Sequence, residues 1–445
     1  MDKYVLKFGG TSLKNAESIK RVNKIITNFY EINKPRQLII VDSAPGKIGD
    51  KKLEDKITNL LEKIFLEKNI RENVNEIFDR FDDLCVKFNI PQPNNLYTEL
   101  KTAIDLNEND EKSYSRLVSL GERIIVNIHG ESLYKEMKKR RIPVKSFDFA
   151  DFGMITDKHK DAYATIDSLL EIEKKLDKED GILIIPGFVG YNEKEEVTTL
   201  GRDGSNYTAA KIAEAIDAKE VFIFSDEPGV RRANPNLIPD AEIIKELSYE
   251  EAIEFAELGA KIINAKCIYP VKRDNIPINI VDEKYNGTKI SSSVSLENMG
   301  AKIITSSGNH SIINITYEND KPGVLSDISK YFRDSKINIE SIADERHSVS
   351  LAFSERDNEN LEYLIKRISQ NYKFKLENQF SRISVIGEGM RNQVGVVNKI
   401  SSAYKNKGIS FEMISQGINQ LNITTFIKED YERIAVKELY NSFFK

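Results

Sequence analysis

Six short apolar runs constrain the fold of this chain more than any other feature of its sequence. They are almost continuously apolar and do not alternate with polar residues, and they occupy residues 4–8, 37–41, 142–147, 181–188, 220–225 and 276–281. Such runs are typical of parallel strands that are buried on both faces. Helical patterns lie between them, for example over residues 207–216. The pattern predicts an α/β fold, with a mostly parallel sheet layered by helices, over residues 1–290.

Two stretches interrupt or end this pattern. The region from about residue 50 to residue 120 is charged, has helical periodicity and contains the loop sequence PQPNN, so we expect a helical insertion there. The stretch 291–308 is polar and rich in serine, and we predict that it is a linker.

The rest of the chain repeats itself at a constant offset. Gly323, Val324, Ile328, Ile337 and Ile342 align without gaps on Gly395, Val396, Ile400, Ile409 and Ile414. Each copy reads as a strand, a helix that begins at glycine, a short turn and a second strand. We therefore predict two tandem β-α-β units, at residues 309–380 and 381–445. Chance similarity between two amphipathic stretches is the alternative.

Composition excludes several classes of function. The net charge is −5, and the one basic run, at 135–141, has acidic neighbours, so we expect no nucleic-acid binding. No stretch approaches 18 apolar residues, so we expect no membrane span. The chain enters a strand at once, shows no signal-peptide pattern and has two isolated cysteines, which predicts a cytoplasmic protein without disulfides. The four histidines show no metal-binding spacing, and we expect no protein metal site.

The sequence KFGGTS follows the first apolar run. Two glycines at a strand end let backbone amides approach a ligand closely, and a helix that begins near Ser12 would add a favourable site for an anion. Lys7 would bring its ammonium group to the same place. An ordinary strand-to-helix turn with an exposed lysine is the alternative.

A second glycine motif, TTLGRDGSNYTAA, covers residues 198–210 and joins a hairpin or strand to a helix expected to begin near Tyr207. Thr199, Gly201, Gly204 and Ser205 provide donors and space, and Arg202 offers a planar fork that suits a carboxylate. An ordinary glycine-rich turn is the alternative here.

Three further places could carry chemistry. Glu122 stands on an otherwise apolar helix face, where it could bind an ammonium group or form a surface ion pair with Arg123 or Lys112. Ser225 and Asp226 follow an apolar strand, at the end where ligands bind in open α/β sheets. Lys261 stands in a helical stretch, where a surface position is the plain reading.

The motifs KFGGTS, SAPGK, SLGERI, TTLGRDGSNYTAA, SDEPGV and LGAKI occur in this order, before the two small repeats. In this respect the chain resembles the aspartokinases of the amino-acid kinase family, which carry a pair of ACT regulatory domains. The resemblance covers nearly the whole chain. It implies an amino-acid-kinase-type sheet followed by two ferredoxin-like ACT domains of the α+β class.

The resemblance also implies roles for single residues. By this resemblance the catalytic residues would be Lys7, Asn206 and Lys261. ATP, as its Mg²⁺ complex and without a tightly bound cofactor, would be held by Lys7, Gly9, Gly10, Ser225, Asp226 and Lys261. L-Aspartate would be held by Ser43, Thr58, Glu122, Arg202 and Ser205, with Glu122 on its amino group and Arg202 and Ser205 on its α-carboxylate. The product would be 4-phospho-L-aspartate, at the first step of lysine, threonine and methionine biosynthesis.

The chain departs from the family pattern at Asn206, where the family has Asp, and at Arg231 and Asn236, in RRANPN where the family has YTADPR. It also has IINA where the family has VLHP. The aspartate β-carboxylate is already ionised at neutral pH, so no general base is needed. Asn206 keeps hydrogen-bonding ability but loses the charge that would orient Lys7. We therefore expect slower transfer, not its loss.

The resemblance places an amino-acid effector at the first repeat, against Gly323, Val324, Leu325, Asn338 and Glu340. Acidic groups there, with Asp344 and Glu345 near by in sequence, favour a cationic effector such as lysine. The family usually has Ser and Asp at positions 338 and 340, so threonine stays open, and a solvated acidic loop is the plain alternative. We expect a homodimer, or a dimer of dimers, through the ACT domains.

Two other functions compete with this reading. One is a catalytically weakened homologue that binds an amino acid and regulates. The other is a kinase for another acidic amino acid, glutamate or acetylglutamate, although these kinases lack the paired ACT tail.

Overall fold

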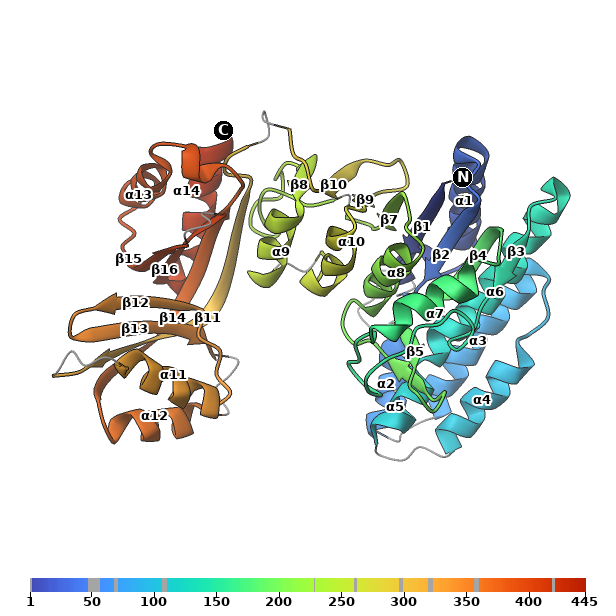
Figure 1. Cartoon of the computed structure of the whole chain (residues 1–445), viewed down its shortest axis with the longest axis horizontal. Coiled ribbons are helices and arrows are strands. Elements are labelled where there is room, and N and C mark those ends of the chain that lie inside the picture. Colours follow the sequence, from blue (N-terminus) through green and yellow to red (C-terminus); the bar gives the residue numbers. More distant parts are fainter. Residues whose placement is uncertain are drawn as a thin grey trace. The chain divides into compact units, whose positions relative to one another are not determined.

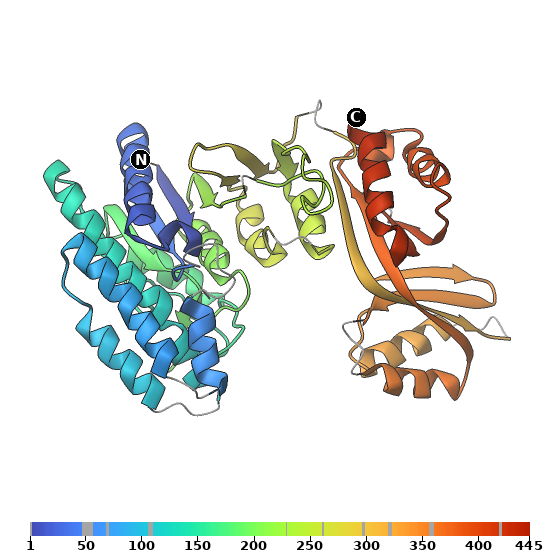
Figure 2. The same cartoon turned by 180° about the vertical axis from the view of Figure 1, so that it is seen from behind.

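The computed structural model of the chain contains two compact units, which we describe separately (Figures 1 and 2). It describes residues 2–46, 57–67, 71–105, 110–227, 229–259, 262–295, 299–318, 323–355, 360–417 and 421–445. The first unit comprises Met1–Val230, Lys245–Tyr249 and Ile262–Ser293. The second comprises Arg231–Ile244, Glu250–Lys261 and Val294–Lys445. Among the helices that are described, none is both long and apolar enough to cross a bilayer.

The first unit is built on an eight-stranded sheet with the order β3-β4-β2-β1-β7-β9-β10-β8. The six predicted runs are its six neighbouring parallel strands, which confirms the α/β prediction. Their bounds are β1 Lys3–Phe8, β2 Gln37–Asp42, β3 Val144–Ser146, β4 Gly181–Pro186, β7 Glu220–Phe224 and β9 Ile278–Val281. β10 (Gly287–Ser291) runs antiparallel to β9 and parallel to β8 (Glu246–Ser248). All of β2 and β4 is buried, as continuous apolar runs require.

One face of this sheet is covered by α1 (Ala16–Asn33), by α6 (Leu120–Met137) and by the predicted helical insertion. The insertion consists of α2 (Ile57–Glu67), α3 (Arg71–Phe88), α4 (Asn94–Asp105) and α5 (Glu111–Val118), and Figures 1 and 2 show these helices gathered together. Tyr4, Leu6 and Phe8 of β1 pack into this layer. Since side chains alternate along a strand, Val5 and Lys7 point to the opposite face.

That opposite face is covered by α8 (Gly204–Ala215), which packs against β1, β2 and β7. α7 (Asp167–Leu176) and α10 (Tyr269–Arg273) lie beside α8. The hairpin expected before α8 is present as β5 (Val189–Tyr191) and β6 (Val197–Thr199). Lys7 therefore projects from the centre of the sheet toward the helix that carries the second glycine motif.

The second unit contains an antiparallel six-stranded sheet with the order β12-β13-β11-β14-β16-β15. Its strands are β11 Ile303–Thr316, β12 Ser341–Glu345, β13 Ser348–Ser354, β14 Lys373–Ile386, β15 Phe411–Gln416 and β16 Asn422–Lys428. Its helices are α9 Tyr249–Glu257, α11 Val324–Asp334, α12 Leu361–Ser369, α13 Val396–Lys405 and α14 Glu432–Phe444. α11 packs with α12 and α13 with α14, over two separate apolar cores (Figure 1).

The two repeats follow one another in the sequence, but their strands are nested in one sheet. β11 and β14 each serve both repeats: residues 310–316 pair with 373–380, and residues 303–307 pair with 382–386. The first half of β11 thus completes the sheet of the second repeat. A register shift between Ser307 and His310, with Asn309 at φ 60°, marks the passage from one repeat to the other. The predicted linker 291–308 is accordingly too long, because β10 ends at Ser291 and β11 begins at Ile303.

Candidate functional site

A cavity of about 840 Å³ lies at the carboxyl ends of β1, β2 and β7 in the first unit. This is the edge of the sheet where ligands bind in open α/β folds. The cavity wall includes Lys7, Gly9, Gly10, Ser43, Glu122, Arg202, Ser205, Asn206, Ser225 and Asp226. Residues predicted from separate motifs are therefore brought together, and Lys7 and Arg202 share one cavity. The side chain of Thr58, in the first turn of α2, and the whole of Lys261 lie outside the described residues, so their roles stay predictions.

The first glycine motif forms a tight turn against the segment that follows β2. The amide nitrogen of Gly46 donates to the carbonyl oxygen of Gly10 at 2.7 Å. A Cβ atom on Gly10 would collide with the carbonyl oxygen of Ala44 and lie 2.9 Å from the nitrogen of Gly46. A Cβ atom on Gly9 would make only ordinary contacts, the nearest 3.7 Å from Nζ of Lys7. Position 10 thus requires glycine, because the backbone of residues 44 and 46 lies too close for a Cβ atom. Position 9 has space next to the Nζ atom of Lys7.

The helix expected near Ser12 begins later than predicted. A 3₁₀ turn spans Gly10–Leu13, and α1 begins at Ala16 with Asn15 as its cap, whose Oδ1 accepts from the amide of Ser18 at 2.9 Å. Asparagine is a strong capping residue, which explains the start of the helix. The amides nearest the cavity therefore belong to the glycine turn and not to the end of α1.

The second glycine motif carries α8, which begins at Gly204 and not near Tyr207 as predicted. Its first turn brings Ser205 and Asn206 into the cavity wall. Asn206 is buried, and its Oδ1 atom has no hydrogen-bond partner among the described residues. A buried acceptor without a partner is costly, so this oxygen is suited to meet a donor that arrives with a ligand.

Glu122 is buried in α6, with 4% of its surface exposed. Burial raises the pKa of its carboxyl group to about 8, against the opposing effect of a hydrogen bond from the backbone amide of Ala44. Its Oε2 atom has no partner among the described residues. The alternative of a surface ion pair is wrong, because Arg123 binds Glu99 and Asp148 and Lys112 binds Glu196. A buried carboxyl group with a free oxygen suits an ammonium ligand.

Sequence reasoning missed one carboxylate in this cavity. Asp203 stands between Arg202 and Gly204 in the second glycine motif. It lines the same cavity as Lys7, and burial raises the pKa of its side chain while the charges of Lys7, Arg202 and Lys266 oppose the rise. No sequence signal marks this, because Lys7 and Lys266 come from two distant segments.

The predicted effector residues lie in the second unit. Gly323 adopts φ 101° at the start of α11, followed by Val324 and by the exposed Leu325. Asn338 is exposed. The carboxylate of Glu340 accepts from Nη1 of Arg382 at 2.7 Å and lies 2.9 Å from Nε2 of His310. Glu340 is therefore not a solvated loop residue, and an effector would have to share it with Arg382.

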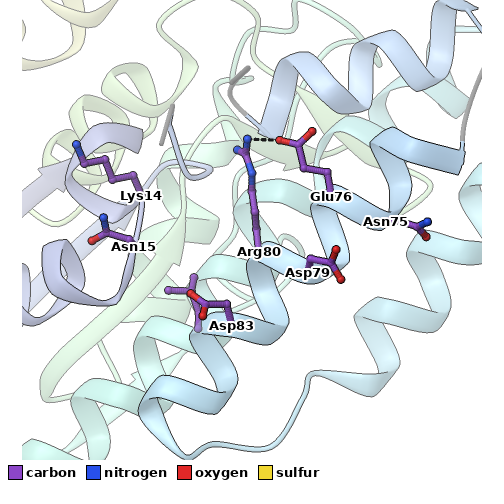
Figure 3. A pocket seen from close by; sticks show the side chains of 8 residues that line it. Lys14, Asn15, Asn75, Glu76, Asp79, Arg80 and Asp83 are labelled. Carbon is purple, nitrogen blue, oxygen red and sulfur yellow. Dashed lines mark hydrogen bonds and ion pairs between the residues drawn. The ribbon is translucent and has the colours of Figure 1, made fainter. Parts of the chain in front are cut away.

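A second hollow, of about 520 Å³, lies between α3 and the turn before α1 (Figure 3). The acidic side chains of Glu76, Asp79 and Asp83 come from α3, and Lys14 comes from the other side. Arg80 pairs with Glu76. It contains none of the residues predicted from the motifs, and we assign it no role.

Comparison with known proteins identifies the family. Residues 2–282 match the sequence model of the amino acid kinase family. The chain belongs to the amino acid kinase family. Residues 383–443 of this kinase match a model of the ACT domain. This match covers the second of the two C-terminal repeats.

Several relatives resemble the kinase over its whole length. The aspartokinase of Geobacillus stearothermophilus is 27% identical, over 99% of this chain and 96% of that one. Aspartokinase 2, chloroplastic, of Arabidopsis thaliana is also 27% identical, over 99% and 84%. The aspartate kinase structure of Clostridium acetobutylicum has a TM-score of 0.81 at 25% identity, covering 99% of this chain and 100% of that one. E. coli aspartokinase III with aspartate and ADP shares the fold, at 22% identity and a TM-score of 0.79 over the full length of both chains.

Proposed function

We propose that this kinase transfers the γ-phosphoryl group of ATP to the β-carboxylate of L-aspartate and forms 4-phospho-L-aspartate. One observation carries the proposal: Lys7 with its glycine turn, Arg202 and Glu122 line a single cavity at the carboxyl edge of the parallel sheet. These groups match the charges of the two substrates. The cations and bare amides suit phosphates and carboxylates, and the buried acid suits an amino group.

For this reaction the protein mainly has to position the two substrates and supply positive charge next to the phosphoryl oxygens. The aspartate carboxylate has an ordinary pKa near 3.9 and is already a nucleophile at neutral pH. Phosphoryl transfer is then accelerated by holding donor and acceptor in line and by neutralising the phosphoryl oxygens. Lys7 and the Gly9–Gly10 turn would hold the transferring group, with Ser225, Asp226 and Lys261 on the nucleotide side. ATP would bring Mg²⁺ as part of the substrate.

Binding of aspartate would use the remaining wall of the cavity. Arg202 and Ser205 would bind the α-carboxylate, and Ser43 and Thr58 would supply hydroxyl groups near the acceptor. Glu122 would bind the α-amino group through the oxygen that has no partner among the described residues. Asn206 would contribute its amide, and we expect a lower rate than a carboxylate at that position would give.

We further propose that an amino acid regulates the activity through the nested C-terminal repeats. The kinase would assemble through these repeats as a homodimer or a dimer of dimers. The solved structures with this fold include E. coli aspartokinase III in complex with lysine and aspartate. Lysine is the first effector to test. We expect it to bind next to Gly323, Val324, Leu325 and Asn338. Because Glu340 is shared with Arg382, threonine stays open. The place in lysine, threonine and methionine biosynthesis and the cytoplasmic location stay predictions, since one of the relatives is chloroplastic.

A second candidate function is an amino-acid-binding regulator without turnover, which the neutral Asn206 favours. The deciding experiment is an ADP-release assay with L-aspartate, L-glutamate or N-acetyl-L-glutamate, each with and without lysine or threonine. We expect turnover with L-aspartate, and the Lys7→Met variant should lower kcat by about 100-fold or more. Arg202→Lys, which keeps the charge but loses the planar fork, should raise KM for aspartate more than KM for ATP. ADP release that is independent of every amino acid would contradict the proposal.

A further inference from the structure

We propose that Lys266 is a positioning residue of this kinase. From outside the cavity it fixes the turn of the second glycine motif, and thereby orients the guanidinium group of Arg202 for the α-carboxylate of aspartate. The inference rests on the proposed function and deepens it. The motifs assign no role to Lys266, and it is not one of the described residues that line the cavity.

The turn that carries Arg202 has an unusual backbone. Gly201 adopts φ 69° and Asp203 adopts φ 58°, so Arg202 lies between two residues in the left-handed region. This region is unfavourable for Asp203, because Asp203 has a Cβ atom. Asp203 is the N-cap residue of α8, but its side chain makes no capping hydrogen bond. Contacts outside the turn therefore have to stabilise this conformation.

Two consecutive side chains contact the backbone on either side of Arg202. Nζ of Lys266 donates to the carbonyl oxygen of Leu200 at 2.5 Å. Sγ of Cys267 lies 3.8 Å from the carbonyl oxygen of Asp203, where a thiol can act as a weak donor. The two contacts lie just before and just after the residue that carries the guanidinium group. They restrict rotation of the turn about its own ends.

The ammonium group of Lys266 is itself held in place. It lies over the rings of two tyrosines, 5.3 Å from the ring centre of Tyr207 in α8 and 5.6 Å from that of Tyr163. The two rings contact each other edge to face, with their centres 6.3 Å apart. Because the faces of aromatic rings attract cations, the rings stabilise the amine at the place where it meets the carbonyl oxygen.

Arg202 depends on the orientation of this turn. Its side chain is exposed and lines the cavity, and in the proposed function it binds the α-carboxylate of aspartate. A guanidinium group makes two parallel hydrogen bonds to a carboxylate only when the two groups are aligned. If the turn could rotate, aligning the guanidinium group on binding would cost free energy. Lys266 lowers this cost and does not contact the substrate.

Steady-state kinetics of full-length variants test the inference. Lys266→Met keeps the apolar stem of the side chain and loses the donor. We expect KM for aspartate to rise by about 10-fold, with kcat and KM for ATP changed by less than about 2-fold. Lys266→Arg keeps the donor and the charge, and its KM for aspartate should lie within about 3-fold of the wild-type value. A wild-type KM in Lys266→Met overturns the inference.

Lys175→Met is the matched control. Nζ of Lys175 donates to the carbonyl oxygen of Ala150 at 2.6 Å and lies 5.3 Å from the ring centre of Tyr191, so it makes the same kinds of contact in the same unit. Neither Lys175 nor Ala150 is among the residues described as lining the cavity. We expect this variant to lower the melting temperature about as much as Lys266→Met but to keep the wild-type KM for aspartate. An equal rise in KM in both variants overturns the inference.

A double-mutant cycle with Arg202 separates positioning from a general effect on the fold. If Lys266 acts through Arg202, Lys266→Met should raise KM by less than about 2-fold further in an Arg202→Ala background. A further 10-fold rise there overturns the inference. Tyr163 is exposed, and Tyr163→Leu removes one of the two rings without changing Lys266. It should raise KM by about 3-fold, and an unchanged KM overturns the inference if Lys266→Met does not fold.

Calorimetric titration with L-aspartate tests the inference without turnover. We expect Kd to follow the same pattern as KM, with a loss in Lys266→Met that depends on Arg202. A wild-type protein that binds aspartate and shows this pattern, but has no aspartate-dependent ADP release, overturns the proposed function alone. Aspartate-dependent turnover with strictly additive effects of Lys266→Met and Arg202→Ala overturns the inference alone.

Discussion

Nδ1 of His129 lies 2.6 Å from Oδ2 of Asp42, and both side chains are completely buried. The other ring nitrogen of His129 lies 2.9 Å from Oδ1 of Asn23, whose amide donates to Ser132 at 3.0 Å. This network ties α6 and α1 to the last residue of β2, directly before Ser43 in the cavity wall. A buried polar network under the cavity can fix the end of the strand that carries the binding loop.

We predict that His129→Leu destabilises the first unit by about 3 kcal/mol, because it leaves the carboxylate of Asp42 buried without its main partner. The double variant Asp42→Leu/His129→Leu should cost less than the sum of the two single variants. Chemical denaturation of all four proteins gives the coupling. Strictly additive costs would show that the two side chains do not depend on each other.

Glu122 should make aspartate binding depend on pH. Its carboxyl group has a pKa raised to about 8 by burial, so it is mostly protonated in the free enzyme at pH 7. An ammonium ligand favours the ionised form, and binding must therefore release a proton. We expect KM for aspartate to fall as the pH rises from 6.5 toward about 8. Calorimetry in buffers of different ionisation enthalpy should show proton release on aspartate binding, and its absence would contradict the assignment.

The same group should affect stability. The folded pKa of Glu122 is about 8, above its ordinary value of 4.5, so its contribution to stability is full below that ordinary value. The contribution declines as the pH rises through the folded pKa. Glu122→Gln, which cannot ionise, should lose less stability than wild type between pH 5 and pH 8. It should also raise KM for aspartate by about 10- to 100-fold through loss of the charged partner.

Gly10 and Gly9 form a matched pair for testing the phosphate turn. Gly10→Ala places a Cβ atom against the backbone of residues 44 and 46, and the turn has to open. We expect a loss of kcat/KM for ATP of about 100-fold or more, because misplaced groups cost that much in oriented reactions. Gly9→Ala meets only ordinary contacts and should lose less than about 10-fold. Equal effects of the two variants would show that close backbone approach is not the reason for the glycine.

Arg382 should influence the response to an amino-acid effector. It donates to Glu340 at 2.7 Å and to the carbonyl oxygen of Leu258, just after α9, at 3.2 Å. Arg382→Gln removes the cation shared by these two sites within the second unit. We expect the effector concentration for half-maximal inhibition to rise by about 5-fold or more. The kcat measured without effector should be nearly unchanged.

Lys375→Gln is the control for this variant, since Lys375 lies on the same strand but is exposed and pairs only with Glu377 among the contacts described. Its inhibition curve should match that of the wild type. The same shift in both variants would indicate a general effect of charge on β14.

Local sequence patterns were enough for the parallel sheet, the helical insertion and the two glycine motifs. Continuous apolar runs depend only on burial of both faces, and a glycine pair at a strand end marks close backbone approach within a few residues. Glu122 could be singled out because a carboxyl group stands alone among apolar neighbours on its helix. Each of these features depends on residues that are close together in the sequence, so it can be predicted without knowing the contacts between distant residues.

Other features depended on residues far apart in the chain. The shared strands β11 and β14 arise from pairing across some 70 residues, which a repeat pattern cannot show. Asp203 carries no sequence signal, and only the fold places it in one cavity wall with Lys7. Glu340 looks like a solvated acid in the sequence, but in the fold it contacts Arg382 and His310. The electrostatic environment of a side chain is set by its neighbours in space, and only the tertiary structure determines which residues these neighbours are.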